Sequence, residues 1–446
     1  MIQAVRNAMR LPDLRRKLLY TLLILIIYRL AAHVPAPGVN TAVLESVSLE
    51  GTGAGGLVGM LNLLSGGAVA RFSILANGVQ SYITATLIFQ LLQPIIPALE
   101  RLAAEGEAGQ RKLNQWTYYV TVPLSLVQSY AWITYLNRVY SQGGAGVPVI
   151  ANFGFTAPEN ILPTISILVS MTAGTMFAVW LGELITEQGV GSGLSLIIFS
   201  GIVASVPGNV GQVIRDADTF LDALPTLVAF LLILVVTMFV VVWVQEGERR
   251  VPVQYGKRVR GIKMYGGGST HIPLKVNTAG MIPLIFAGSI LSFPSMIATL
   301  FQGSENEGVK KAAETIINVF SQNSDWYIPI YFVAVVGLTY FYTDMMVQQR
   351  DLPGSLQKQG GFIPGIRPGR RTADYINSVY RRITLVGALF LGAVAVLPYI
   401  VNSVTDGGGQ LLITSSGLLI VVGTVLDTMR QLEAQLLMRH YDGFIK

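Results

Sequence analysis

The chain has 446 residues, of which 52% are hydrophobic and 13% are charged, and its formal net charge is +6. A soluble protein of this size does not need so much apolar sequence, so the composition indicates a membrane protein with several spanning segments. The chain contains no cysteine, which excludes disulfides, thiolate metal sites and cysteine nucleophiles.

Apolar stretches long enough to cross roughly 30 Å of hydrocarbon recur along the whole chain. We expect ten transmembrane helices, near residues 18–35, 57–94, 116–137, 160–181, 190–207, 223–245, 276–300, 327–347, 381–400 and 411–436. The charged segment Met1–Lys17 lacks a small-residue cleavage site after the apolar run that follows it, so we interpret that run as a retained first span. The predicted fold class is therefore an all-α polytopic membrane protein.

The second stretch is the least regular. A short apolar piece, Leu57 to Leu64, precedes Ser65-Gly66-Gly67 and Arg71, and a longer helix with several polar side chains is expected from Ser73 to Leu92. Lipid satisfies neither free backbone groups nor an arginine, so a broken helix at membrane depth must be buried in protein or line a water-filled cavity. Two interpretations stay open here, a surface or re-entrant loop before an ordinary span, and a half-helix that occupies a pore.

The fifth and seventh stretches are polar or glycine-rich where they begin. The fifth starts with Gly189 to Ser195, and the seventh starts with Lys275 to Gly280. For Gly191 and Gly193 the simplest interpretation is close helix packing through small residues. Polar starts also suit helices that line a cavity.

Most of the positive charge lies in two loops. Arg249 to Lys275 and Arg350 to Arg382 each hold seven Lys or Arg against no more than two Asp. An even number of spans places both termini on one side, and the positive-inside rule makes that side, with loops 246–275 and 348–382, cytoplasmic. The two loops predict a basic platform on which a large acidic partner docks.

Residues that carry chemistry are scarce. No phosphate-binding G-x-x-x-x-G-K-[ST] motif is present, and the three histidines lie near span ends or in loops. Four acids lie within or at the ends of spans, and local pairing explains each better than a proton relay does; they are Glu183, Glu187, Asp344 and Asp427. The sequence therefore indicates no enzyme, no catalytic or metal site and no cofactor.

Several longer motifs occur together and in a characteristic order. They are Asn62–Ala68, Ala173–Met176, Trp180–Ser195, Pro273–Asn277, Gly361–Gly369 and Leu418–Val422. Together they resemble the SecY family, the protein-conducting channels of bacterial secretion, from the first span to the C-terminus. The resemblance implies two pseudo-symmetric inverted five-helix halves, residues 1–207 and 208–446, around a central hourglass pore.

By motif position, the resemblance implies three groups of site residues. An apolar pore ring is expected at Val79, Ile83, Leu194, Ile198, Ile285 and Ile420. A plug is expected at about 57–71, with Leu57, Met60, Leu61, Leu64, Ser65, Gly66, Gly67 and Arg71, and a lateral gate at Thr84, Gln90, Asn277 and Phe293. Val79 and Ile83 are four residues apart, as are Leu194 and Ile198, so each pair lies on one face of its helix. This spacing supports the assignment independently of the resemblance.

The family also implies partners, since the chain itself has no motor motif. They are a cytoplasmic motor, either the ribosome or the ATPase SecA, the small membrane subunits SecE and SecG, signal sequences, nascent chains and the lipid bilayer of the bacterial cytoplasmic membrane. The residues expected to dock a motor are Arg249, Arg250, Lys257, Arg258, Arg260, Lys263 and Arg367. Arg367 stands out because prolines and glycines on both sides fix its backbone.

Three positions depart from the family pattern. Ser81 stands where the family usually has proline, Gln80 where it has an apolar residue, and Ile262-Lys263 where it often has two arginines. The first two add polarity beside the ring, so we expect either a looser seal or a Gln80 side chain that points at a neighbouring helix. The third shifts the expected docking charge toward Lys257 to Arg260.

Two other classes fit ten spans. An inverted-repeat transporter of a small solute should have a charged or strongly polar cluster at the bilayer midplane, where this sequence offers only amides and hydroxyls. A membrane scaffold needs no pore.

Overall fold

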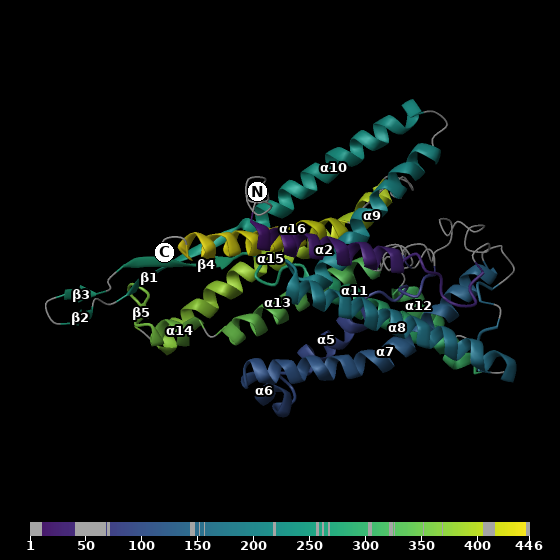
Figure 1. Ribbon diagram of the computed structural model, residues 1–446, viewed down its shortest axis with the longest axis horizontal. Helices are drawn as coiled ribbons and strands as arrows, with labels where there is room; N and C mark the ends of the chain where they lie inside the picture. The colour runs from purple at the N-terminus through teal and green to yellow at the C-terminus, as the bar shows by residue number, and fades with distance from the viewer. Residues whose placement is uncertain are drawn as a thin grey trace. The chain divides into compact units, whose positions relative to one another are not determined.

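The computed structural model describes most of the chain. The described residues are 11–40, 68, 72–142, 148–150, 152–155, 157–216, 220–255, 258–260, 263–265, 268–301, 306–320, 324, 326–350, 352–367, 369–404 and 415–442. A helix occupies part of every predicted span, which confirms the helical fold class (Figure 1). These helices are α2 (Pro12–Ala31), α5 (Gln80–Leu92), α7 (Glu107–Gln142), α8 (Pro158–Gln188), α9 (Gly193–Asp216), α10 (Phe220–Glu246), α11 (Ile282–Phe301), α13 (Tyr327–Arg350), α15 (Arg370–Val404) and α16 (Ser415–Asp442).

Only some of these helices are uniformly apolar. Within the described residues, three are long and apolar enough by themselves to span a membrane, at Pro158–Gln188, Tyr327–Val347 and Arg370–Leu397. A fourth candidate combines α5 with α6 (Pro97–Ala104), and these two helices are bent by 104° at the break between them. Shorter apolar helices within the residues searched are Gly193–Gly208, Leu234–Glu246 and Ile282–Ser295, which belong to α9, α10 and α11.

Helix α5 begins later than the sequence predicts, at Gln80 and not at Ser73. The preceding segment is extended or turned, and non-local backbone hydrogen bonds hold it there: the Ala36 amide donates to the Phe72 carbonyl at 2.9 Å, and the Ile74 amide to the Val34 carbonyl at 3.1 Å. Phe72 has a φ of 46° and a fully buried side chain. The Phe72 carbonyl, which would accept the first intrahelical hydrogen bond of a helix that begins at Ser73, is therefore already bonded to another segment.

Two compact units divide the chain. The first comprises Met1–Leu227, Gly288–Ile328 and Ile420–Lys446, and includes α5, α7, α8, α9 and α12 (Glu307–Phe320). Its main apolar core lies among α7, α8 and the segment before α5, with Phe72, Trp132, Ile133, Ile167 and Met171 all at most 4% exposed. The predicted division into halves at 207 and 208 concerns symmetry and topology, and it stays a prediction.

The second unit comprises Val228–Ala287 and Pro329–Leu419, and it holds both basic loops. Strand β1 (Glu248–Tyr255) pairs antiparallel with β4 (Ser269–Lys275) on one edge and with β5 (Gly361–Phe362) on the other. Strands β2 (Arg258–Arg260) and β3 (Lys263–Tyr265) form a hairpin between β1 and β4 in the chain. Figure 1 shows this small sheet beside α14 (Leu352–Lys358). The fold is thus mostly helical, with a sheet that the sequence analysis did not predict.

Candidate functional site

The two polar residues that depart from the family pattern both bind neighbouring helices. Ser81 is fully buried at the start of α5, and its Oγ donates a hydrogen bond to Oε1 of Gln128 on α7 at 2.5 Å. Gln80 is half-buried, and its Nε2 donates to Oγ of Ser289 on α11 at 2.6 Å. The alternative in which Gln80 points at a helix neighbour is therefore the one that the structure shows.

A further polar side chain, Asn77, lies just before α5. Nδ2 of Asn77 donates to Oγ of Ser129 on α7 at 2.7 Å, and Oγ of Ser125 donates to Oγ1 of Thr175 on α8 at 3.2 Å. These bonds satisfy polar side chains inside an apolar bundle, where an unpaired polar group is costly. Hydrogen bonds as well as apolar contacts thus join α5 to its neighbours.

The predicted ring residues are apolar and largely buried. Val79, Ile83, Ile198 and Ile420 are between 1% and 9% exposed in the first unit, and Ile285 is 8% exposed in the second. Val79 is the residue immediately before α5, and Ile83 follows one turn later. Burial of this kind is equally expected of ordinary core residues, so the ring stays a prediction.

Leu194, the sixth ring residue, is only half-buried and packs against α8. A Cβ atom added to Gly182 would lie 2.9 Å from Cδ2 of Leu194. A Cβ added to Gly193 would lie 1.7 Å from the carbonyl oxygen of Gly182, so the start of α9 and the end of α8 meet through two glycines. Gly191 has a φ of +90°, and a Cβ there would contact Thr428 of α16. The interpretation of Gly191 and Gly193 as close-packing residues is confirmed.

The predicted gate residues form local bonds. Oγ1 of Thr84 donates to the carbonyl of Gln80 at 2.9 Å, and Nδ2 of Asn277 donates to the carbonyl of Gly280 at 3.0 Å. Oε1 of Gln90 and Oδ1 of Asn277 are buried and have no hydrogen-bond partner within the described residues. Phe293 is half-buried on α11. Thr84 and Gln90 belong to the first unit and Asn277 to the second, so their predicted cluster stays a prediction.

The predicted plug falls outside the described residues. Leu57, Met60, Leu61, Leu64, Ser65, Gly66, Gly67 and Arg71 are all among those not described.

The basic loops meet in one sheet. Gln254 and Tyr255 of the first loop pair with Phe362 and Gly361 of the second through β1 and β5. Val251 and Val253 are buried against a core that includes Ile363 and Ile376 of the second loop. Because alternate residues of a strand point to opposite faces, burying these valines turns their neighbours outward.

The docking residues differ in how far they are described. Arg249 and Arg250 on β1 are exposed, and Nε of Arg250 lies 2.7 Å from Oε1 of Glu248. Arg367 is exposed between Gly365, with a φ of +82°, and Gly369, with a φ of +106°, as the flanking sequence predicts. Arg258, Arg260 and Lys263 lie on β2 and β3, and Lys257 lies outside the described residues.

Sequence reasoning missed the partners of the polar α5 residues, Gln128 and Ser289, although the polarity of Gln80 and Ser81 indicated that partners were needed. No group of three or more His, Asp or Glu residues suited to a metal occurs in the described part of the chain.

Many helices, a bent α5–α6 pair and two basic loops joined in one sheet define the class of polytopic membrane proteins. Comparison with solved structures shows the fold: the chain superimposes on "The structure of a protein conducting channel" with a TM-score of 0.59 at 14% identity, covering 94% of this chain and 91% of that one. Sec61 in a canine ribosome-channel complex from the endoplasmic reticulum gives 0.55 at 15% identity and the same coverage.

Sequence comparison identifies the particular family. The SecY family model matches residues 73–429. The protein translocase subunit SecY of Halalkalibacterium halodurans is 42% identical over 453 residues, covering 100% of both chains. The chain therefore belongs to the SecY family: it is a multi-pass bacterial membrane protein and a protein-conducting channel, not an enzyme. Membership excludes the small-solute transporter and the scaffold as alternatives.

Proposed function

We propose that unfolded secretory polypeptides cross the cytoplasmic membrane through a pore closed at rest by the predicted ring and plug. Apolar side chains in a narrow throat disfavour water and ions, so the resting pore stays dry without a covalent seal. The apolar character of all six ring residues supports this role. The division into inverted halves, 1–207 and 208–446, supplies the two walls of that pore.

Transmembrane helices leave the pore sideways, between the second helix and the seventh. The observation that carries this proposal is the hydrogen bond from Gln80 on α5 to Ser289 on α11. A single polar bond between two helices is easier to break than an interdigitated apolar contact, since water or the polar backbone of a passing chain replaces it. A signal sequence with about ten leucine-like residues gains on the order of 3 to 6 kcal/mol on entering lipid. That gain is enough to shift a closed and an open state separated by a few kcal/mol.

A partner on the platform supplies direction. Exposed Arg249, Arg250 and Arg367 all belong to the unit whose sheet joins the two loops, and their charges suit acidic protein or RNA surfaces. The ribosome is one candidate, because the canine Sec61 relative is in a ribosome-channel complex. The ATPase SecA is the other, and SecE and SecG complete the membrane complex. Both termini and both basic loops then lie in the cytoplasm.

Cross-linking tests the path of the polypeptide directly. The chain has no cysteine, so a single cysteine placed at Val79 or Ile420 is a unique probe. A stalled nascent chain should cross-link to Val79→Cys and to Ile420→Cys. It should not cross-link to Val169→Cys, since Val169 is 55% exposed on the outside of α8. Equal cross-linking at Val79 and Val169 would show that the ring residues are core packing and that the pore is elsewhere.

A further inference from the structure

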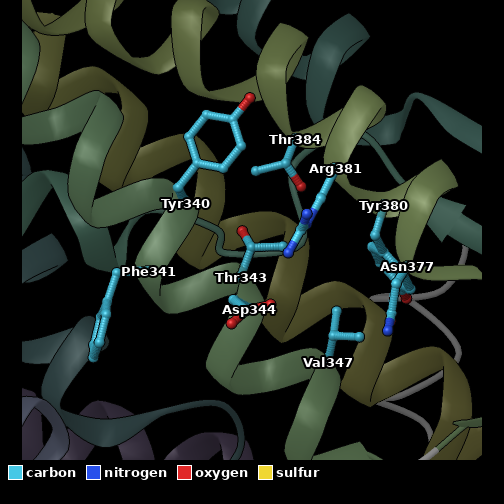
Figure 2. Close-up of a pocket in the computed structure, with 9 residues that line it drawn as sticks. All are labelled: Tyr340, Phe341, Thr343, Asp344, Val347, Asn377, Tyr380, Arg381 and Thr384. Carbon is cyan, nitrogen blue, oxygen red and sulfur yellow. The ribbon is translucent and has the colours of Figure 1, made fainter. Parts of the chain in front are cut away.

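A cavity of about 390 Å³ lies between α13 and α15 in the second unit (Figure 2). Its walls recur at helical spacing, so one face of each helix is turned toward it. The lining residues are Tyr340, Phe341, Thr343, Asp344 and Val347 on α13 and Asn377, Tyr380, Arg381 and Thr384 on α15. None of them belongs to the pore ring, the gate, the plug or the docking residues.

Helices α13 and α15 are in contact near Gly392, and the cavity separates them further along. A Cβ atom added to Gly392 of α15 would lie 2.7 Å from Cε2 of Phe332 on α13, so the absence of a side chain at Gly392 admits the aromatic ring. Eight residues from this contact along each helix, about 12 Å away, the cavity lies between Tyr340 and Thr384. The separation of the helices is therefore local.

The cavity lies where α15 changes from polar to apolar sequence. Arg381 and Arg382 end the polar first part of α15, and an apolar run begins at Ile383. Arginine and tyrosine at such a boundary are typical of the membrane-water interface, where lipid headgroups lie. The cavity is thus at headgroup depth between two helices long and apolar enough to span a membrane.

Hydrogen-bond donors from both helices converge on this space. Thr343 and Thr384 are 4% and 5% exposed and line the cavity. Arg381 and Asn377 also line it, and both of these side chains are exposed. Figure 2 shows Arg381 extending toward Thr343, with the hydroxyl of Thr384 nearby.

We propose that this cavity binds the phosphodiester headgroup of a membrane phospholipid. A guanidinium, an amide and two buried hydroxyls together offer the donors that phosphate oxygens accept, and Arg matches phosphate with two parallel bonds. The position of the cavity at headgroup depth between two spans favours a lipid over a soluble anion.

Native mass spectrometry of the purified, delipidated translocase complex tests the site. Phosphatidylethanolamine or phosphatidylglycerol is added in detergent, with or without inorganic phosphate.

We expect Arg381→Gln to lower the affinity for the lipid about tenfold, the effect of losing a charge-assisted bond. Arg382→Gln is the matched control, because Arg382 is an exposed neighbour that does not line the cavity. Thr384→Val, which keeps the volume and removes a hydroxyl, should lower the affinity less.

Three outcomes would overturn the proposal. Equal loss in Arg381→Gln and Arg382→Gln would indicate surface charge and no specific site. Unchanged lipid binding in Arg381→Gln, or in Thr384→Val should Arg381→Gln fail to fold, would show that the cavity holds no headgroup. Displacement of lipid by inorganic phosphate at comparable concentration would identify a soluble anion as the ligand.

Discussion

Nε2 of Gln80 lies 2.6 Å from Oγ of Ser289, and this hydrogen bond joins α5 to α11. Ser289 is 3% exposed, while Oε1 of the same Gln80 amide is buried without a hydrogen-bond partner in the described structure. An amide satisfied at one end and unsatisfied at the other stabilises a helix contact less than a fully bonded amide does. The contact therefore suits two helices that must separate.

The first prediction compares two ways of removing this bond. Ser289→Ala deletes the acceptor and leaves the Gln80 amide with neither end paired, which destabilises the closed contact by roughly 1 to 3 kcal/mol. Preproteins with a shortened hydrophobic signal segment should then be exported at least severalfold better. Gln80→Leu removes the bond together with the buried amide and adds apolar contact, so export of the same preproteins should not improve.

Export of a signal-length series in cells measures both variants. A preprotein with an intact signal is the control, since its partition energy already suffices to open the gate. If Ser289→Ala and Gln80→Leu export the weak-signal preproteins equally well, the assignment of this contact to the gate is contradicted. Equal export would mean that the Gln80 amide does not affect the stability of the closed state.

The sequence predicted that Gln80 and Ser81 are exceptional, but it did not predict their partners. A polar side chain in an apolar span must find a hydrogen bond, and that much follows from local sequence. The partners Gln128 and Ser289 are 47 and 209 residues away. Which of many buried hydroxyls and amides lies within reach depends on the packing of distant helices.

The same distinction explains which features of the fold could be predicted. Features set by local sequence were predicted, and features set by contacts between distant segments were not. All ten predicted spans contain helices, because the length of an apolar run is a local property. The start of α5 was predicted seven residues too early, since bonds to Val34 and Ala36 hold the preceding segment. The pairing between the two basic loops was not predicted because β5, the strand from the second loop, has two residues, too few to give an alternating pattern.

The second prediction concerns the platform. Arg367→Glu should strongly reduce preprotein translocation while leaving membrane insertion and thermal stability of the protein near those of the parent. Arg367 is exposed, and an exposed charge contributes at most about 1 kcal/mol to stability. Lys358→Glu is the matched control, an exposed residue at the end of α14 in the same loop. Translocation assayed in membrane vesicles should fall in the first variant only. Normal export by Arg367→Glu would exclude the docking role.

The third prediction concerns the glycines between α8 and α9. Gly193→Ala places a methyl group 1.7 Å from the Gly182 carbonyl, so the helices must move apart. We expect a loss of at least roughly 1 to 3 kcal/mol of stability, typical of overpacking. Gly208→Ala, on the same helix with nothing within 4 Å, should stabilise by roughly 0.5 to 1 kcal/mol. Thermal unfolding of the two purified variants tests the difference. Similar melting temperatures would show that the glycine contact is not tight.

The fourth prediction is topological. Loops 246–275 and 348–382 should be cut by a protease added to inside-out vesicles and protected in intact cells, because positive charge is retained on the cytoplasmic side. The sheet formed by both loops requires the two to share a side. Cleavage of either loop from outside the cell would reverse the orientation.

The last prediction concerns the ring. Ile420 and Ile285 are 3% and 8% exposed, and replacing either with Asn puts an amide where the proposed throat is apolar. Water then enters more easily, so the closed state loses stability and ion conductance at rest should rise severalfold. Weak signals should be exported better too, because a less stable closed state requires less partition energy to open.

Asn277→Leu should behave differently, altering the signal threshold without a comparable leak, since Asn277 is predicted to lie at the gate. Planar-bilayer conductance and signal-series export measure the two effects separately. Parental conductance and parental signal discrimination in both isoleucine variants would make these residues core packing and the ring assignment wrong.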